Sequence, residues 1–104
     1  MNSSRNPYEI FKQEAPEVFD GYNALVQSLV DAPGLDQKTK QLIYLGMKAA
    51  QGDDTAILFH VPMAKEAGAT RDEIKETILL TLTVTGLKGV NCCLAKALEI
   101  YDIN

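Results

Sequence analysis

The sequence has few of the features that place a small protein in a specialised class. Its two cysteines, Cys92 and Cys93, are neighbours. They cannot form an ordinary framework of structural disulfides, which fits a reducing compartment. The longest apolar run is far shorter than the roughly 20 residues of a membrane-spanning helix, and the first residues contain no apolar signal segment. We therefore expect a soluble, cytoplasmic protein without a membrane partner.

Charge of one sign is not concentrated anywhere along the chain. Ten basic and fourteen acidic side chains give a net charge of −4. They are spread without a run of like charge that would mark a binding surface for nucleic acid, so nucleic acid is not an expected partner. With 104 residues, the chain is expected to form a single domain, 1–104, around one hydrophobic core.

Local signals predict two helices in the first third of the chain. Asn6 followed by Pro7 is typical of a helix start, and Pro16 starts a second helix. From Pro16 to Val30 apolar residues recur at spacings of three and four, which indicates an amphipathic helix. The sequence DAPG at residues 31–34 ends it.

Two further helices are predicted around the only histidine. Asp36 can cap a helix that runs to about Gln51, with Gly52 as its stop, and Asp53 or Asp54 can cap the next, over roughly residues 54–67. That helix contains His60 and, two residues later, Pro62. Because proline cannot donate a backbone hydrogen bond, we expect a kink just after His60 that frees the carbonyl of Leu58.

The last third of the chain combines a firm signal with an ambiguous one. Thr70 and Glu73 have the spacing of a capping box, which marks a helix start. The following TILLTLTVTG alternates and is β-branched, as in a strand, but a lone strand would have no partner, so we interpret it as helix. Asn91 is a plausible cap for a final helix. The predicted class is all-α, a compact bundle of about five or six helices.

From Leu35 to Tyr101 the sequence resembles the superfamily of carboxymuconolactone decarboxylases and AhpD-like proteins (alkylhydroperoxidase D). The resemblance lies in the order of a helix, a histidine-bearing helix, a glycine turn and the segment GATRDEIKETI, with His60, Ala64 and Gly68 in register. It implies an all-helical family core over about 35–101, assembly into a homo-oligomer, commonly a trimer or hexamer, and no cofactor.

The resemblance implies two kinds of chemistry acting on a small-molecule substrate. In the AhpD-like branch, a CxxCxxxH motif with an upstream glutamate performs thiol–disulfide exchange, often for a peroxiredoxin as redox partner protein. In the decarboxylase branch, acid–base groups remove carbon dioxide from a lactone acid. Here the two motif cysteines would fall on Asp53 and Ala56 and the glutamate on Gln41, so that only His60 remains. Exchange at this motif is excluded because it requires a sulfur nucleophile.

Cys92 and Cys93 are the candidate thiols that could work with His60. If Asn91 caps the last helix, both lie in its first turn, where the helix dipole favours the thiolate and lowers the thiol pKa. The alternative is that both are small apolar residues of the core. The candidate catalytic residues are therefore His60, Cys92 and Cys93.

His60 itself has two interpretations. It is either a proton-transfer residue or a core histidine bonded to a carbonyl, such as that of Leu58 or one in a neighbouring chain. Asp53 is interpreted as a helix cap, with the alternative that it orients His60. One histidine and two adjacent cysteines make a poor ligand set, so no metal site is predicted.

Three functional hypotheses follow. The first, which we favour, is a redox protein of peroxide defence, an alkylhydroperoxidase, peroxiredoxin-type enzyme or disulfide reductase, in which a thiol of Cys92 or Cys93 works with His60. The second is a cofactor-free decarboxylase that uses His60 alone. The third is a binding or assembly module that retains the fold without the chemistry.

Overall fold

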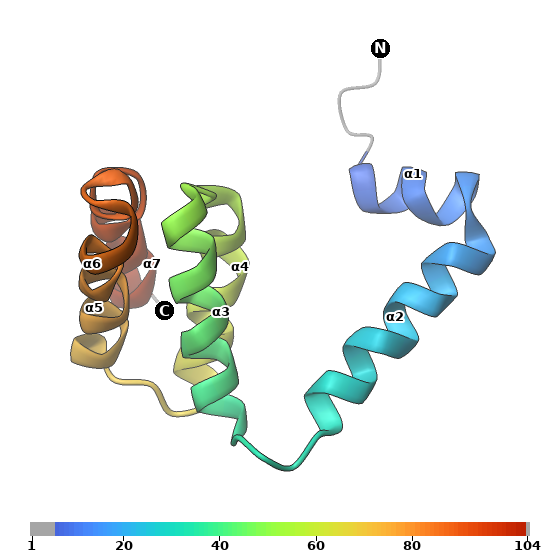
Figure 1. Cartoon of the computed structure of the whole chain (residues 1–104), viewed down its shortest axis with the longest axis horizontal. Helices are drawn as coiled ribbons and strands as arrows, with labels where there is room; N and C mark the ends of the chain where they lie inside the picture. Colours follow the sequence, from blue (N-terminus) through green and yellow to red (C-terminus); the bar gives the residue numbers. More distant parts are fainter. Residues whose placement is uncertain (1–5, 104) are drawn as a thin grey trace. The chain divides into compact units, whose positions relative to one another are not determined.

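The computed structural model describes residues 6–103, which form helices joined by short turns (Figure 1). Six α-helices in this range have eight or more residues: α1 (Pro7–Glu14), α2 (Pro16–Asp31), α3 (Gln37–Gln51), α4 (Asp54–Glu66), α5 (Arg71–Leu80) and α7 (Ala95–Ile103). A short helix α6 (Leu82–Thr85) and a π-helical turn η1 (Val90–Leu94) complete the order. No strand occurs among the described residues, so the all-α prediction is confirmed.

The described chain divides into two compact units, residues 6–34 and residues 35–103. In the first unit, Asn6 caps α1 by accepting from the amide of Tyr8, as predicted. Phe19 of α2 is the buried residue of this unit and packs edge-on against the rings of Tyr8 and Phe11. That the two units form a single domain stays a prediction.

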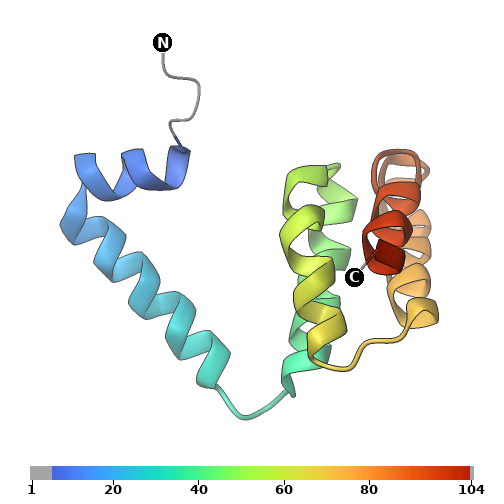
Figure 2. The same cartoon turned by 180° about the vertical axis from the view of Figure 1, so that it is seen from behind.

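The second unit is a helical bundle with a continuous core. Figures 1 and 2 show α3 beside α4, and α5 and α6 near α7. Its core is made of small and branched apolar side chains: Leu45, Ala49, Ile57, Val61, Ala64, Ala69, Ile74, Ile78, Cys93 and Ala97. These residues recur at spacings of three and four within each helix, which is why each helix turns one face inward.

In this unit, helix caps mark the helix starts and a glycine marks a helix end at the positions that the sequence predicts. Asp36 caps α3 and Asp53 caps α4, each by accepting from a backbone amide three residues ahead. Gly52 ends α3 with φ 75°, a left-handed conformation that side chains disfavour. The capping box of Thr70 and Glu73 is present with both hydrogen bonds.

The segment TILLTLTVTG is helical, which confirms the interpretation against a strand. It continues α5 to Leu80 and then forms α6, whose end is marked by Gly86. Thr81, between the two helices, is buried and donates to the carbonyl of Ile78. Burial of an apolar α5 against the neighbouring helices therefore prevails over the local preference for a strand.

The predicted start of the last helix is wrong. Helical backbone begins at Lys88, and Gly89 has helical φ and ψ angles of −68° and −40°. The amide of Asn91 already donates to the carbonyl of Leu87, so Asn91 lies inside the helix and does not cap it. The close packing at Gly89 leaves no room for a side chain, because a Cβ there would lie 2.8 Å from the carbonyl oxygen of Ala49.

Candidate functional site

The histidine of α4 faces three polar residues of α3. Gln41, Tyr44 and Lys48 follow one another at spacings of three and four, so they share one side of α3. The helices α3 and α4 pack against each other along their length. The pairing of these two faces places His60 among side chains that can bond to it, stack on it and influence its charge.

Gln41 holds the imidazole of His60 by a hydrogen bond. The distance between His60 Nδ1 and Gln41 Oε1 is 2.9 Å. An amide oxygen only accepts, so Nδ1 of a neutral ring must carry the proton and donate it. Nε2 then keeps its lone pair. This is the arrangement of a base whose second nitrogen is fixed by a neighbour.

Tyr44 and Lys48 complete the surroundings of the ring. The rings of Tyr44 and His60 lie 4.1 Å apart between centroids at an angle of 38°, and Lys48 Nζ lies 5.6 Å from the centroid of Tyr44. Burial of His60, and secondarily the positive charge of Lys48, lower the pKa of the imidazole below its ordinary value. The neutral ring is therefore favoured at neutral pH.

Two alternatives considered within the chain, the carbonyl of Leu58 as partner of His60 and Asp53 as the residue that orients it, are not observed, and a carbonyl of a neighbouring chain stays a prediction. The Nδ1 partner is Gln41 rather than the carbonyl of Leu58. Helix α4 continues through Pro62 to Glu66. Asp53 accepts from the amide of Ala56 and pairs with Lys48 Nζ at 3.5 Å, so it acts as the cap of α4, as interpreted, and not as the residue that orients His60.

The cysteines occupy a different place in the bundle. Both lie in the π-helical turn η1, past the first turn of their helix, so the predicted effect of a free helix end on their thiols is absent. Cys93 is fully buried in the core, and burial, followed by its contact with Cys92, raises the pKa of its thiol to about 12. The expectation of a lowered thiol pKa at Cys93 was wrong because the thiol is buried, and the contact with Cys92 and the carboxylates of Asp54 and Asp53 add to the effect of burial.

Cys92 is held by the turn between α3 and α4. Its thiol donates to the carbonyl oxygen of Gly52 at 3.1 Å. Within residues 6–103, no hydrogen bond joins His60 to either cysteine. The structure thus brings His60 together with Gln41, Tyr44 and Lys48, and leaves the thiols on the core side.

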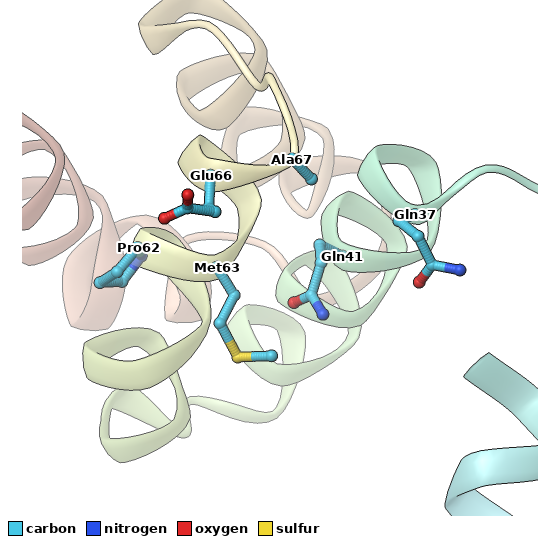
Figure 3. Close-up of a pocket in the computed structure, with 6 residues that line it drawn as sticks. All are labelled: Gln37, Gln41, Pro62, Met63, Glu66 and Ala67. Carbon is cyan, nitrogen blue, oxygen red and sulfur yellow. The ribbon is translucent and has the colours of Figure 1, made fainter.

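A cavity of about 330 Å³ lies beside Gln41, the hydrogen-bond partner of His60. It is lined by Gln37 and Gln41 of α3 and by Pro62, Met63, Glu66 and Ala67 of α4. In Figure 3 the side chains of Gln41 and Met63 extend into the space between the two helices, one from each. Gln41 therefore contacts both the ring of His60 and the cavity.

The described residues offer no ready metal centre. Within residues 6–103, no three side chains of histidine, cysteine, aspartate or glutamate gather as a metal-binding group.

None of the helices in this range has the length and hydrophobicity needed to cross a membrane.

Sequence reasoning missed the roles of Tyr44 and Lys48 and treated Gln41 only as a departure from a motif. A signal was present, because Gln41, Tyr44 and Lys48 are spaced to lie on one face of the helix that precedes the histidine helix. Without the pairing of the two helices, that face had no identified partner.

Comparisons with known proteins place the chain in one family. A sequence model of the carboxymuconolactone decarboxylase family matches residues 16–97. A solved structure from Legionella pneumophila, the apo form of a carboxymuconolactone decarboxylase family protein, is 30% identical with a TM-score of 0.80, covering 91% of this chain and 84% of that one.

Two curated proteins are also similar. An uncharacterized protein of Methanocaldococcus jannaschii is 28% identical over 95 residues, 90% of this chain and 88% of that protein. The 4-carboxymuconolactone decarboxylase of Acinetobacter baylyi is 30% identical over 69 residues, 66% of this chain but only 52% of the enzyme. The family match covers most of the sequence and the same helical fold recurs in a solved relative, and we conclude that the chain belongs to the carboxymuconolactone decarboxylase family.

Proposed function

We propose that this protein is a cofactor-free acid–base enzyme that decarboxylates a small lactone or oxo acid, with His60 as the proton-transfer residue. The observation that carries the proposal is the hydrogen bond from His60 Nδ1 to Gln41, because it leaves Nε2 with a lone pair and joins the ring to a residue that lines a cavity. The name of the Acinetobacter relative supports the reaction class.

The proposed step needs no thiol and no redox partner. The carboxylate of the substrate leaves as carbon dioxide, and the electron pair of the broken carbon–carbon bond moves into the conjugated carbonyl. Protonated His60 then delivers a proton to the carbon, and the ring regains a proton from solvent. A bound carboxylate supplies the negative charge that raises the imidazole pKa, so the ring, neutral in the free protein, takes up its proton as the substrate binds.

The charged residues at and near the cavity favour one orientation of the bound substrate. Lys48 lies outside the cavity lining, pairs with Asp53 and lowers the pKa of His60, whereas Glu66 lines the cavity on α4 and is exposed. A carboxylate is attracted to Lys48 and repelled by Glu66. We therefore expect the acid group of the substrate to bind away from Glu66, with its neutral part toward Glu66.

Turnover of lactone and oxo acids by the purified protein, followed as carbon dioxide release, tests the proposal. We expect His60→Gln to lower kcat by about 100-fold or more, the usual contribution of a positioned acid–base residue. Gln41→Leu should lower kcat less, because the ring remains but is no longer held. The matched control is Gln51→Leu, the same change at an exposed position of α3, which should leave kcat unchanged.

Two outcomes contradict the proposal: full turnover by His60→Gln, or no turnover of any acid of these classes. The thiols are tested in parallel with the double variant Cys92→Ser, Cys93→Ala, which should retain activity because neither thiol bonds to His60. Loss of carbon dioxide release in that variant, with the fold intact by circular dichroism, would mean that a thiol takes part in the reaction.

A further inference from the structure

Cys92 and Cys93 form a pair of thiols that the proposed function does not use. They are consecutive residues of the π-helical turn η1. Cys93 is fully buried in the core, and Cys92 is half-buried and packs against the same core cluster. The two thiols contact each other. Because one helical turn holds both residues, the pair is arranged before any ligand arrives, which lowers the entropic cost of binding to both.

The surroundings of the pair favour thiols over thiolates. Burial, the contact with Cys92 and two nearby carboxylates raise the pKa of the Cys93 thiol to about 12. The Cys92 thiol donates its proton to the carbonyl oxygen of Gly52 at 3.1 Å. Zinc is a poor ligand for this pair, because it requires deprotonated cysteines and takes four ligands. Within the described part of the chain, no third acidic, histidine or cysteine side chain joins the pair as a metal-binding group.

A trivalent organic arsenical, R–As=O, meets these conditions. It reacts with two neutral thiols: two arsenic–sulfur bonds form, the arsenic–oxygen double bond breaks, and both thiol protons leave with the oxygen as water. No atom changes its oxidation state, and no thiolate has to persist. The product is uncharged, so it can lie in an apolar core without the cost of a buried ion. Its two sulfur atoms lie on the same side of the arsenic, as suits two thiols in contact.

We propose that Cys92 and Cys93 form a binding site for trivalent organic arsenicals, separate from the decarboxylation site at His60. Cys92 reacts first, because it is the less buried of the two, and in doing so it gives up its hydrogen bond to Gly52. Cys93 then closes the ring through its contact with Cys92. Arsenous acid, which prefers three sulfur ligands, binds more weakly, since the chain contains only two cysteines.

The first test measures binding of phenylarsine oxide to the native protein by intact-protein mass spectrometry, in the presence of glutathione as a competing monothiol. One phenylarsenic group per chain is expected, with the loss of one water. Cys92→Ala and Cys93→Ala each leave one thiol and should weaken the apparent affinity by about 100-fold or more, because the second bond is no longer intramolecular. Arsenite is measured in parallel and should bind less tightly than phenylarsine oxide.

A matched control keeps two thiols but separates them. Cys92→Ala combined with Asn91→Cys places the thiols two residues apart, and such residues do not face each other on a helix. This variant should bind as weakly as the single variants. Circular dichroism establishes that each variant is folded, and the variants at the half-buried Cys92 decide the question if Cys93→Ala does not fold.

The second test identifies which state of the chain binds, because two adjacent cysteines can also capture arsenic in an unfolded chain. Phenylarsine oxide should raise the Tm of wild type, since a ligand that favours the folded state stabilises it. An unchanged or lowered Tm contradicts the proposal. So does wild-type affinity in either single variant or in the matched control, or the binding of two phenylarsenic groups per chain. Tighter binding of arsenite than of phenylarsine oxide would overturn the assigned ligand class.

Discussion

At the scale of single residues, His60 is controlled by three side chains of one neighbouring helix. Gln41 fixes which nitrogen carries the proton, Tyr44 covers the ring, and Lys48 opposes its protonation. Gln41 stands where AhpD-like relatives are expected to have glutamate. An amide bonds the ring without adding a negative charge, so it holds the imidazole in place and leaves it neutral.

This arrangement predicts the direction of a pH effect. Because its pKa is lowered in the folded chain, His60 contributes stability that is present above about pH 6.5 and is lost as the pH falls through the lowered pKa. Gln41→Glu places a carboxylate against the ring and should raise the imidazole pKa above its ordinary value. The stability contribution of His60 is then present at low pH and lost as the pH rises through the raised pKa.

Nuclear magnetic resonance titration of the imidazole measures the two pKa values, and urea unfolding at several pH values, with His60→Gln as reference, measures the stability. The same spectra report the tautomer, which should carry its proton on Nδ1 in wild type. A wild-type ring with the proton on Nε2, or an unchanged pKa in Gln41→Glu, would show that the hydrogen bond to Gln41 does not control this histidine.

At the scale of elements, the close approach of Gly89 to α3 leaves no room for a side chain at this position. We predict that Gly89→Ala destabilises the fold by about 1–3 kcal/mol, although alanine is the better helix former. The new Cβ would lie 2.6 Å from Thr81 Oγ1 and 2.8 Å from the backbone oxygen of Ala49, which cannot yield without moving α3. Urea unfolding measures the difference.

The matched control is Gly46→Ala, also within a helix, where the nearest atom to the new Cβ is Thr77 Cγ2 at 3.4 Å. It should change the free energy of unfolding by less than about 1 kcal/mol. Equal stability of wild type and Gly89→Ala would mean that the helices can separate at little cost.

The helix caps and Gly89 together show which parts of the fold the sequence could predict. Caps at Asn6, Asp36 and Thr70 act within three residues, so the starts of α1, α3 and α5 were predictable. Gly89 resembles a helix break in the sequence, but its role depends on a contact with Ala49, forty residues away. The interpretation of Asn91 as a cap failed because the helix already begins at Lys88, and the expected thiol reactivity depended on that cap.

For the candidate site, the sequence indicated the histidine and the helix that carries it. It did not indicate that Lys48 would influence the ring, because this requires the register between α3 and α4. It also left the burial of Cys93 open, since a cysteine is equally compatible with a helix end and a core.

At the scale of the whole molecule, nearly all of the buried apolar residues belong to residues 35–103. Hydrogen bonds from residues of α7 to the rest of this unit stabilise it. Arg71 forms two hydrogen bonds with Asp102, Lys65 donates to the carbonyl of Tyr101, and the Tyr101 hydroxyl donates to the carbonyl of Ala69. Helix α7 is thereby joined to α4 and to the start of α5.

We therefore predict that a chain of residues 35–104 folds without the first two helices. Its free energy of unfolding should be about 3–7 kcal/mol, the range for a domain of this size. A single cooperative urea transition, coincident by circular dichroism and by tyrosine fluorescence, is the expected result. A gradual transition, or one that depends on the probe, would mean that residues 6–34 are needed for the core to form.

The π-helical turn at Val90–Leu94 has a consequence for how the length of this chain can change. A π-helical turn is an α-helix with one residue inserted, so removal of the exposed Asn91 would restore ordinary helical hydrogen bonding while both flanking segments keep their register. A deletion within α3 or α5 would instead rotate every following side chain by about 100° away from the core. This turn is thus where evolution, or a designer, can add or remove a single amino acid without rebuilding the protein.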